Sequence, residues 1–186
     1  MRIYDVDMVS NLVEEFFKTK KVREIMHYVI SYKLNDWEKW FQIEFAHFIH
    51  QKNEYIVKRE VTAYLDTMLF PDSSHVKIDL VLREQDPLFS KSFVFIEVKC
   101  TKKASALIKG LKEDKDKIKA IRKCEYRKRS FVGIGFYLLC DPETSDRMDS
   151  YVTEKLKGTH DLFNICKCPQ QSKCKCEFKK IGVVIY

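Results

Sequence analysis

The sequence predicts an α/β protein with a central mixed β-sheet flanked by helices. Three observations support this prediction. A chain of 186 residues with 45% hydrophobic content can bury one sizeable core. Apolar residues recur first at helical spacing and then in strand-like runs that alternate with further helices. Five glycines and four prolines leave little room for flexible linkers, so we expect one domain over residues 1–186.

The N-terminal part of the chain is predicted to be helical. Residues 5–32 carry two apolar stripes, and a strongly patterned helix follows to about residue 52, with Asn35 or Asp36 as its N-cap. The expected parts of the domain are an N-terminal helical extension at 1–35, a catalytic core at 36–140, and a C-terminal helix with a cysteine-containing hairpin at 141–186.

The remaining elements follow from hydrophobic periodicity and turn residues. Residues 55–65 alternate as a strand does, and Pro71-Asp72-Ser73-Ser74 is a turn signal before the next strand. The expected order continues with a strand around Asp79, a strand around Glu97, a helix at about 105–123, a strand at 130–140, a helix at 144–157 and a closing strand at 177–186.

Charged residues interrupt two neighbouring apolar runs. Strand side chains alternate in direction, so Glu97 and Lys99 share one face of their strand. On the preceding strand Asp79 shares a face with Val81, and Ile78 points the other way. Charges persist inside a sheet when they pair or hold a metal. A structural ion pair is the alternative, but buried ion pairs stabilise poorly, which favours a metal site.

The chemistry of such a site suits phosphodiester hydrolysis. Mg²⁺ binds one or two protein carboxylates together with water and phosphate, and it can activate a water molecule. Asp79 and Glu97 fit that ligand set, with the backbone carbonyl of Val98 as a further ligand. Lys99 can orient the attacking water or stabilise developing negative charge. Glu44, on the preceding helix, can complete the ligands or bind a second metal.

These residues together resemble the PD-(D/E)XK nuclease superfamily over about Trp37 to Leu139. The helical glutamate matches Glu44, the motif aspartate matches Asp79, and Glu97-Val98-Lys99 matches the (D/E)XK element. The residues before Asp79 are Lys77-Ile78, which lack the nominal proline of the family. The resemblance implies a restriction-endonuclease-like core and a metal-dependent nuclease that cuts DNA with Mg²⁺ or Mn²⁺. Homodimers and larger nuclease complexes are common in this family.

The net charge of +7 suits a polyanionic partner. Four lysines before and within the charged helix are the expected nucleic-acid contacts: Lys102, Lys103, Lys109 and Lys112. A solvated helix face with internal ion pairs is the alternative for this segment. Glu60, on the first strand, either faces the mouth of the site or lies on a solvated face beside Lys58 or Arg59.

Seven cysteines and the lack of an apolar N-terminal segment favour a reduced, cytoplasmic location. No apolar run is long enough for a membrane span, so we expect no membrane partner. Near the C-terminus two Cys-x-Cys pairs flank a short loop. Their thiolates, at Cys166, Cys168, Cys174 and Cys176, either bind a metal, Zn²⁺ in preference to an iron–sulfur cluster, or remain reactive thiols outside catalysis.

Two other functional classes stay open. A catalytically inactive nucleic-acid-binding or assembly module can keep the same fold, although it has no physical reason to retain buried charges. A zinc-dependent regulatory protein can be organised by the C-terminal cysteines.

Overall fold

The computed structural model describes residues 2–32, 34, 37–85, 91–138, 140–166 and 180–186. The helices are α1 (Arg2–Lys18), α2 (Lys20–Ser31), α3 (Trp37–Gln51), α4 (Ala104–Lys119) and α5 (Pro142–Tyr151), which continues into a π-helical turn, η1 (Val152–Leu156). The strands are β1 (Tyr55–Leu65), β2 (His75–Glu84), β3 (Phe93–Thr101), β4 (Ile121–Cys124), β5 (Lys128–Tyr137), β6 (Thr159–Asn164) and β7 (Lys180–Ile185). Within these ranges no helix is both long and apolar enough to cross a membrane.

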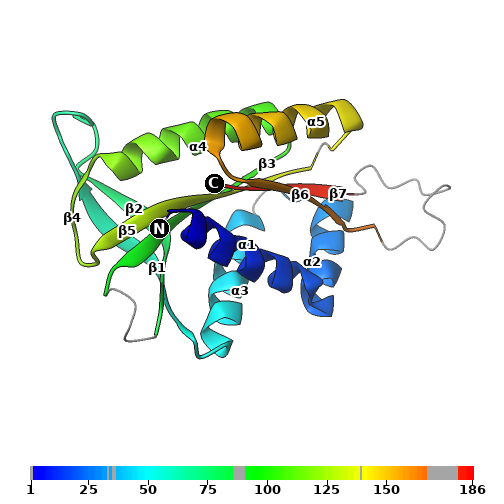
Figure 1. Ribbon diagram of the computed structural model, residues 1–186, viewed down its shortest axis with the longest axis horizontal. Coiled ribbons are helices and arrows are strands. Elements are labelled where there is room, and N and C mark those ends of the chain that lie inside the picture. Colours follow the sequence, from blue (N-terminus) through cyan, green and yellow to red (C-terminus); the bar gives the residue numbers. More distant parts are fainter. Residues whose placement is uncertain (1, 33, 35–36, 86–90, 139, 167–179) are drawn as a thin grey trace.

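The strands form one mixed sheet in the order β4-β1-β2-β3-β5-β7-β6. Neighbouring strands are antiparallel except β3 and β5, which run parallel and are joined through α4 and β4. Helices α1, α2 and α3 lie on one face of the sheet, and α4 and α5 lie on the other (Figure 1). The predicted α/β class, with helices on both faces of a mixed sheet, is therefore confirmed.

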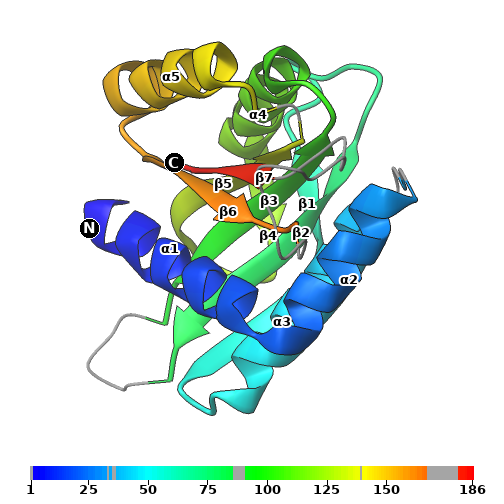
Figure 2. The same ribbon diagram turned by 90° about the vertical axis from the view of Figure 1, so that its right-hand side faces the viewer.

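Each face of the sheet has its own apolar core. Under α1, α2 and α3, aromatic side chains such as Phe16, Phe41 and Phe45 pack edge-to-face or stacked above the strands. On the other face, Leu107 and Leu111 of α4 pack with C-terminal residues of the sheet. The two cores fix α3 and α4 on opposite sides of β3, as seen in Figure 2.

The structure divides some elements differently from the sequence prediction. Residues 5–32 form two helices because Thr19 has extended backbone and its hydroxyl accepts a hydrogen bond from the Val22 N–H, which caps α2. The short strands β4 and β6 were not expected. They are specified by pairing with β1 and β7, which a local hydrophobic pattern does not reveal.

The β2–β3 ladder is unusually short for its strands. It contains three residue pairs and ends at Leu80 opposite Ile96. The next position of this register would place Asp79 opposite Glu97. At the same point β2 loses its alternation, because Ile78 packs in the same cluster as Val81 rather than with Leu80. The prediction that Ile78 faces away from Val81 is therefore wrong.

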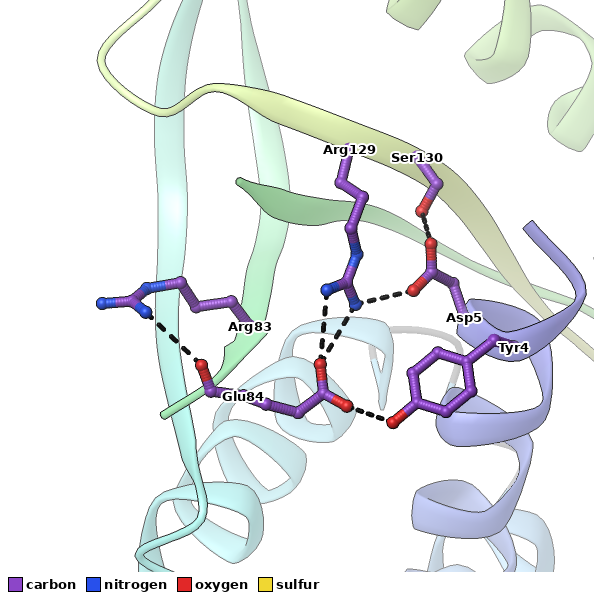
Figure 3. A network of polar contacts seen from close by, with 6 residues as sticks. All are labelled: Tyr4, Asp5, Arg83, Glu84, Arg129 and Ser130. Carbon is purple, nitrogen blue, oxygen red and sulfur yellow. Dashed lines mark hydrogen bonds and ion pairs between the residues drawn. The ribbon is translucent and has the colours of Figure 1, made fainter. Parts of the chain in front are cut away.

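A buried polar network ties α1 to the sheet at the other end of β2. Arg129 of β5, whose side chain is 3% exposed, forms ion pairs with Asp5 at 2.6 Å and with Glu84 at 3.3 Å. Ser130 donates a second hydrogen bond to Asp5, and Tyr4 donates to Glu84 (Figure 3). The network joins two carboxylates to one guanidinium, and removal of one partner would leave a buried charge without compensation.

Replacing Asp5 with alanine should destabilise the protein by about 3–5 kcal/mol, because Arg129 would remain buried with an incomplete set of acceptors. Urea unfolding of wild type and variant measures the difference. Asp7→Ala is the matched control, since Asp7 is exposed on the same helix, and it should change the unfolding free energy by less than about 0.5 kcal/mol. Equal effects of the two substitutions would contradict the structural role of the network.

Candidate active site

Asp79 lies where β2 and β3 separate. Its Oδ2 accepts a hydrogen bond of 2.8 Å from the backbone N–H of Val98. The side chain thus satisfies an N–H that would otherwise face the gap in the ladder. Because the N–H and C=O of one strand residue point to the same side, the Val98 carbonyl faces this gap as well. The sequence prediction that Asp79, Glu97 and Val98 come together agrees with this geometry.

Glu97 is buried next to Asp79 on β3. It is 8% exposed, and its Oε1 has no hydrogen-bond partner among the described residues. Burial, followed by the nearby charges of Asp79 and Asp114, raises the pKa of Glu97 to about 10. Burial also raises the pKa of Asp79, against the opposing effects of the Val98 N–H and of a hydrogen bond with the protonated Glu97. Two carboxylates here cannot both be charged cheaply without a cation.

Helix α4 holds Lys99 against the sheet. The Lys99 stem packs over Gly110, where a Cβ would come within 3.2 Å of the stem carbons. Lys99 Nζ forms an ion pair with Asp114 Oδ2 at 3.2 Å. Burial lowers the pKa of Lys99, but Asp114, Glu38 and Asp79 together oppose it, so the pKa is raised overall. Lys99 therefore stays an ammonium at neutral pH.

Asp114 was missed in the sequence, where the charged side of this helix was taken as solvated. Asp114 is 6% exposed and lies in the buried row of α4 with Leu107, Leu111 and Ile118. Those positions are four, three and four residues apart, which is the spacing of one helix face. A carboxylate in that row is the signal that could have identified it.

Glu38 is the second acidic residue that the sequence analysis missed. It begins the first turn of α3, and its Oε2 accepts a 2.9 Å hydrogen bond from the N–H of Cys100. Burial raises the pKa of Glu38, while the Cys100 N–H and Lys99 oppose the shift. Asp79 and Glu38 accept hydrogen bonds from the N–H groups of Val98 and Cys100, two residues apart on β3, and this brings the two carboxylates close together.

The structure does not bring Glu44 to this site, which corrects the sequence prediction. Glu44 forms an ion pair of 3.0 Å with Lys21 of α2. It lies six residues after Glu38, and at 3.6 residues per turn this places it on another side of α3. Glu38 takes the position expected for Glu44. Glu60 pairs with Lys39 of α3, and the ion pairs of the described residues do not join it to Lys58 or Arg59.

The lysines predicted to contact nucleic acid lie along the first half of α4 and just before it. Lys109 is exposed and lies 4.0 Å from Glu113. Lys103 lines a cavity of about 400 Å³ between α4 and α5, whose lining includes none of Asp79, Glu97 and Lys99. Lys112 lines a smaller groove beside Tyr186, and Lys102 precedes α4. Their role in binding stays a prediction.

The cysteine prediction falls mostly outside the described residues. Cys166 is half-buried after β6, but Cys168, Cys174 and Cys176 lie in the segment 167–179 that the structure does not describe. Within the described ranges, no group of three or more histidine, cysteine or acidic side chains is arranged as a complete metal site. The Zn²⁺ prediction is therefore not tested.

The residues at the end of the β2–β3 ladder fit a hard divalent cation. Mg²⁺ requires few protein carboxylates and otherwise takes water and phosphate oxygens. Asp79 and Glu97 offer oxygen donors from adjacent strands, and Glu97 Oε1 is a buried oxygen without a partner in the described part of the chain. A cation would satisfy this atom and relieve the repulsion that raises the Glu97 pKa.

Comparisons with protein-family models, curated proteins and solved structures each found no match. The resemblance to the PD-(D/E)XK nucleases therefore depends on the residues of this chain.

The raised pKa of Glu97 predicts how stability depends on pH in EDTA. The folded protein keeps a proton on Glu97 that the unfolded chain releases. The contribution of this proton to the unfolding free energy is complete below a pH of about 4.5, and it is lost progressively as the pH rises to about 10. Glu97→Gln removes this titration. Relative to wild type, the variant should gain unfolding free energy as pH rises, by up to about 1.4 kcal/mol per pH unit.

Urea unfolding at a series of pH values checks this expectation. A difference between wild type and Glu97→Gln that stays constant with pH would show that Glu97 has an ordinary pKa.

Proposed function

We propose that this protein is a metal-dependent nuclease that hydrolyses phosphodiester bonds of DNA. The observation that carries the proposal is the meeting of Asp79, Glu97 and Lys99 where β2 and β3 separate, with Glu97 Oε1 lacking a partner among the described residues. The choice of DNA comes from the PD-(D/E)XK resemblance. The order β1-β2-β3-α4, with α4 leading to a strand parallel to β3, supports a restriction-endonuclease-like core.

In this proposal Asp79 and Glu97 hold Mg²⁺ or Mn²⁺, with the Val98 carbonyl and Glu38 as further oxygen donors. The bound ion would lower the pKa of a water molecule and neutralise charge on the phosphate. The Val98 and Cys100 N–H groups hold the Asp79 and Glu38 carboxylates in place by hydrogen bonds of 2.8 and 2.9 Å. Fixed carboxylates need little rearrangement when the substrate arrives.

Lys99 contributes a fixed positive charge. Since its pKa is raised, it acts as an ammonium that stabilises negative charge on the reacting phosphate, and it does not act as a base. Asp114 is the positioning residue for Lys99, because the ion pair directs the ammonium from α4 and Gly110 leaves space for the stem. Lys117 also contacts Asp114, at 3.4 Å, so the pair is embedded in a small network.

Substitutions on α3 and in the site test the proposal. With Mg²⁺, Asp79→Asn, Glu97→Gln and Glu38→Gln should each lower the rate of plasmid cleavage at least about a hundredfold, since each removes a charge that holds the cation. Glu44→Gln, on the same helix as Glu38, is the matched control and should cleave at the wild-type rate. EDTA should abolish cleavage by all of them.

Two results would contradict the proposal. Wild-type cleavage that persists in EDTA would exclude the metal site, and wild-type protein that binds DNA without cleaving it in Mg²⁺ or Mn²⁺ would favour the inactive binding module.

Removing the carboxylate of Asp114 should affect Lys99 rather than the cation. Asp114→Asn should lower kcat about 10–100-fold, as loss of an orienting group around a metal site commonly does. The Mg²⁺ concentration for half-maximal activity should stay unchanged. Asp116→Asn is the control, because Asp116 is exposed and pairs with Lys119 on the same helix. A large shift in the Mg²⁺ requirement of Asp114→Asn would contradict the assigned role.

A further inference from the structure

The outer halves of β1 and β2 expose one side of the sheet next to the proposed active site. Val61, Ala63 and Ile78 pack toward α4, so the residues alternating with them point to the opposite side. That side carries Thr62, Tyr64, His75, Lys77 and, from the edge strand β4, Lys123. All but Thr62 are exposed, and Tyr64 is 52% exposed. We call these five residues the hairpin face.

The strand register lines up the hairpin face with the site. Tyr64 lies between His75 on β2 and Lys123 on β4, and Thr62 lies beside Lys77. Lys77 precedes Asp79 by two residues on the same strand, a separation of about 7 Å. The face thus begins at the tip of the β1–β2 hairpin and ends at Asp79. Glu97 and Lys99 belong to the other side of the sheet, with Phe93 and Phe95, and the two sides meet where the β2–β3 ladder ends. Figure 1 shows this hairpin and β4 at the left-hand edge of the molecule, beyond α3.

The hairpin face carries two lysines that lie outside the ion pairs of the described residues. Lys77 and Lys123 form no ion pair within the described part of the chain. Asp66, in the hairpin loop, pairs with Arg122 at 2.6 Å. Glu125, just after β4, interacts with the Tyr126 hydroxyl. The pKa of Glu60 is lowered mainly by its partner Lys39, and Lys77 lies near enough for its charge to add to this effect. Two ammonium groups outside any ion pair of the described residues, beside an exposed tyrosine, match a phosphate backbone with an unstacked base.

We propose that the hairpin face binds a single-stranded segment of the DNA substrate and guides it to Asp79 and Glu97. This inference rests on the proposed nuclease function and names the form of its substrate. Lys77 and Lys123 neutralise backbone phosphates, and the ring of Tyr64 stacks on a base. Stacking requires a base whose face is free, which a duplex does not offer, so the face favours single strands over duplex DNA.

Fluorescence anisotropy of labelled oligonucleotides in EDTA tests the binding face without cleavage. Lys77→Ala/Lys123→Ala should bind single-stranded DNA more weakly and reduce the slope of log affinity against log salt by between about 1 and 2. Lys20→Ala/Lys155→Ala removes the same net charge from exposed lysines elsewhere, and should leave the slope unchanged. Equal losses in both double variants would overturn the proposal.

Tyr64 variants test the stacking contact. Tyr64→Ala should weaken single-stranded binding at least about fivefold and leave duplex binding nearly unchanged, whereas Tyr64→Phe should keep the wild-type affinity. Tyr28→Ala, at an exposed tyrosine of α2, serves as the control. Unaltered binding by Tyr64→Ala, or a preference for an RNA strand of the same sequence, would overturn the assignment to single-stranded DNA.

Cleavage of the same oligonucleotides in Mg²⁺ separates this inference from the proposed function. If the wild type cleaves single-stranded DNA while the lysine and tyrosine variants bind normally, the binding role of the hairpin face is wrong and the proposed nuclease activity is retained. If the variants lose binding but the wild type never cleaves, the hairpin face is a DNA-binding surface and the proposed nuclease activity is wrong.

Discussion

The end of the β2–β3 ladder at Leu80 and Ile96 is the constraint on which the rest of the site depends. Where the strands separate, the N–H groups of Val98 and Cys100 lose their strand partners, and buried N–H groups are rarely left unpaired. Here two carboxylates, from Asp79 and Glu38, accept those hydrogen bonds. The requirement of the backbone for acceptors thus places acidic groups from β2 and α3 around one short segment of β3.

The protein contains two buried charged networks with different balances. At one end of β2, Arg129 lies between Asp5 and Glu84, with hydroxyl groups completing the hydrogen bonds. At the other end the acidic groups Glu38, Asp79, Glu97 and Asp114 lie around the half-buried ammonium of Lys99. In the first arrangement each carboxylate contacts the guanidinium, which is typical of a structural link. In the second, Glu97 Oε1 has no hydrogen-bond partner among the described residues, and a bound cation would stabilise the gathered carboxyl groups.

Much of the fold and part of the site could be predicted from the sequence, because hydrophobic periodicity identifies elements that bury one face. The positions of Glu97 and Lys99 on the face of Phe93 and Phe95 followed from alternation alone. The face change near Asp79 did not, since it depends on how β2 meets β1 and β3. Strand β4 is similarly defined by its partner.

The choice between Glu38 and Glu44 shows a second limit. Both residues lie on α3 near its apolar stripe, and the sequence motif selected the one farther along the helix. What distinguishes them is the position of α2, which supplies Lys21 to Glu44, and the free N–H of Cys100, which receives Glu38. Asp114, in contrast, could have been recognised from its spacing with Leu107 and Leu111.

The most direct test of the central claim is a crystal structure of the protein grown with Mn²⁺, with the ion located by its anomalous scattering. The account predicts one strong peak between the carboxylates of Asp79 and Glu97, on the side of the Val98 carbonyl, with Glu44 still paired to Lys21. A peak elsewhere, or Asp79 and Glu97 both paired with lysines and no ion between them, would contradict it.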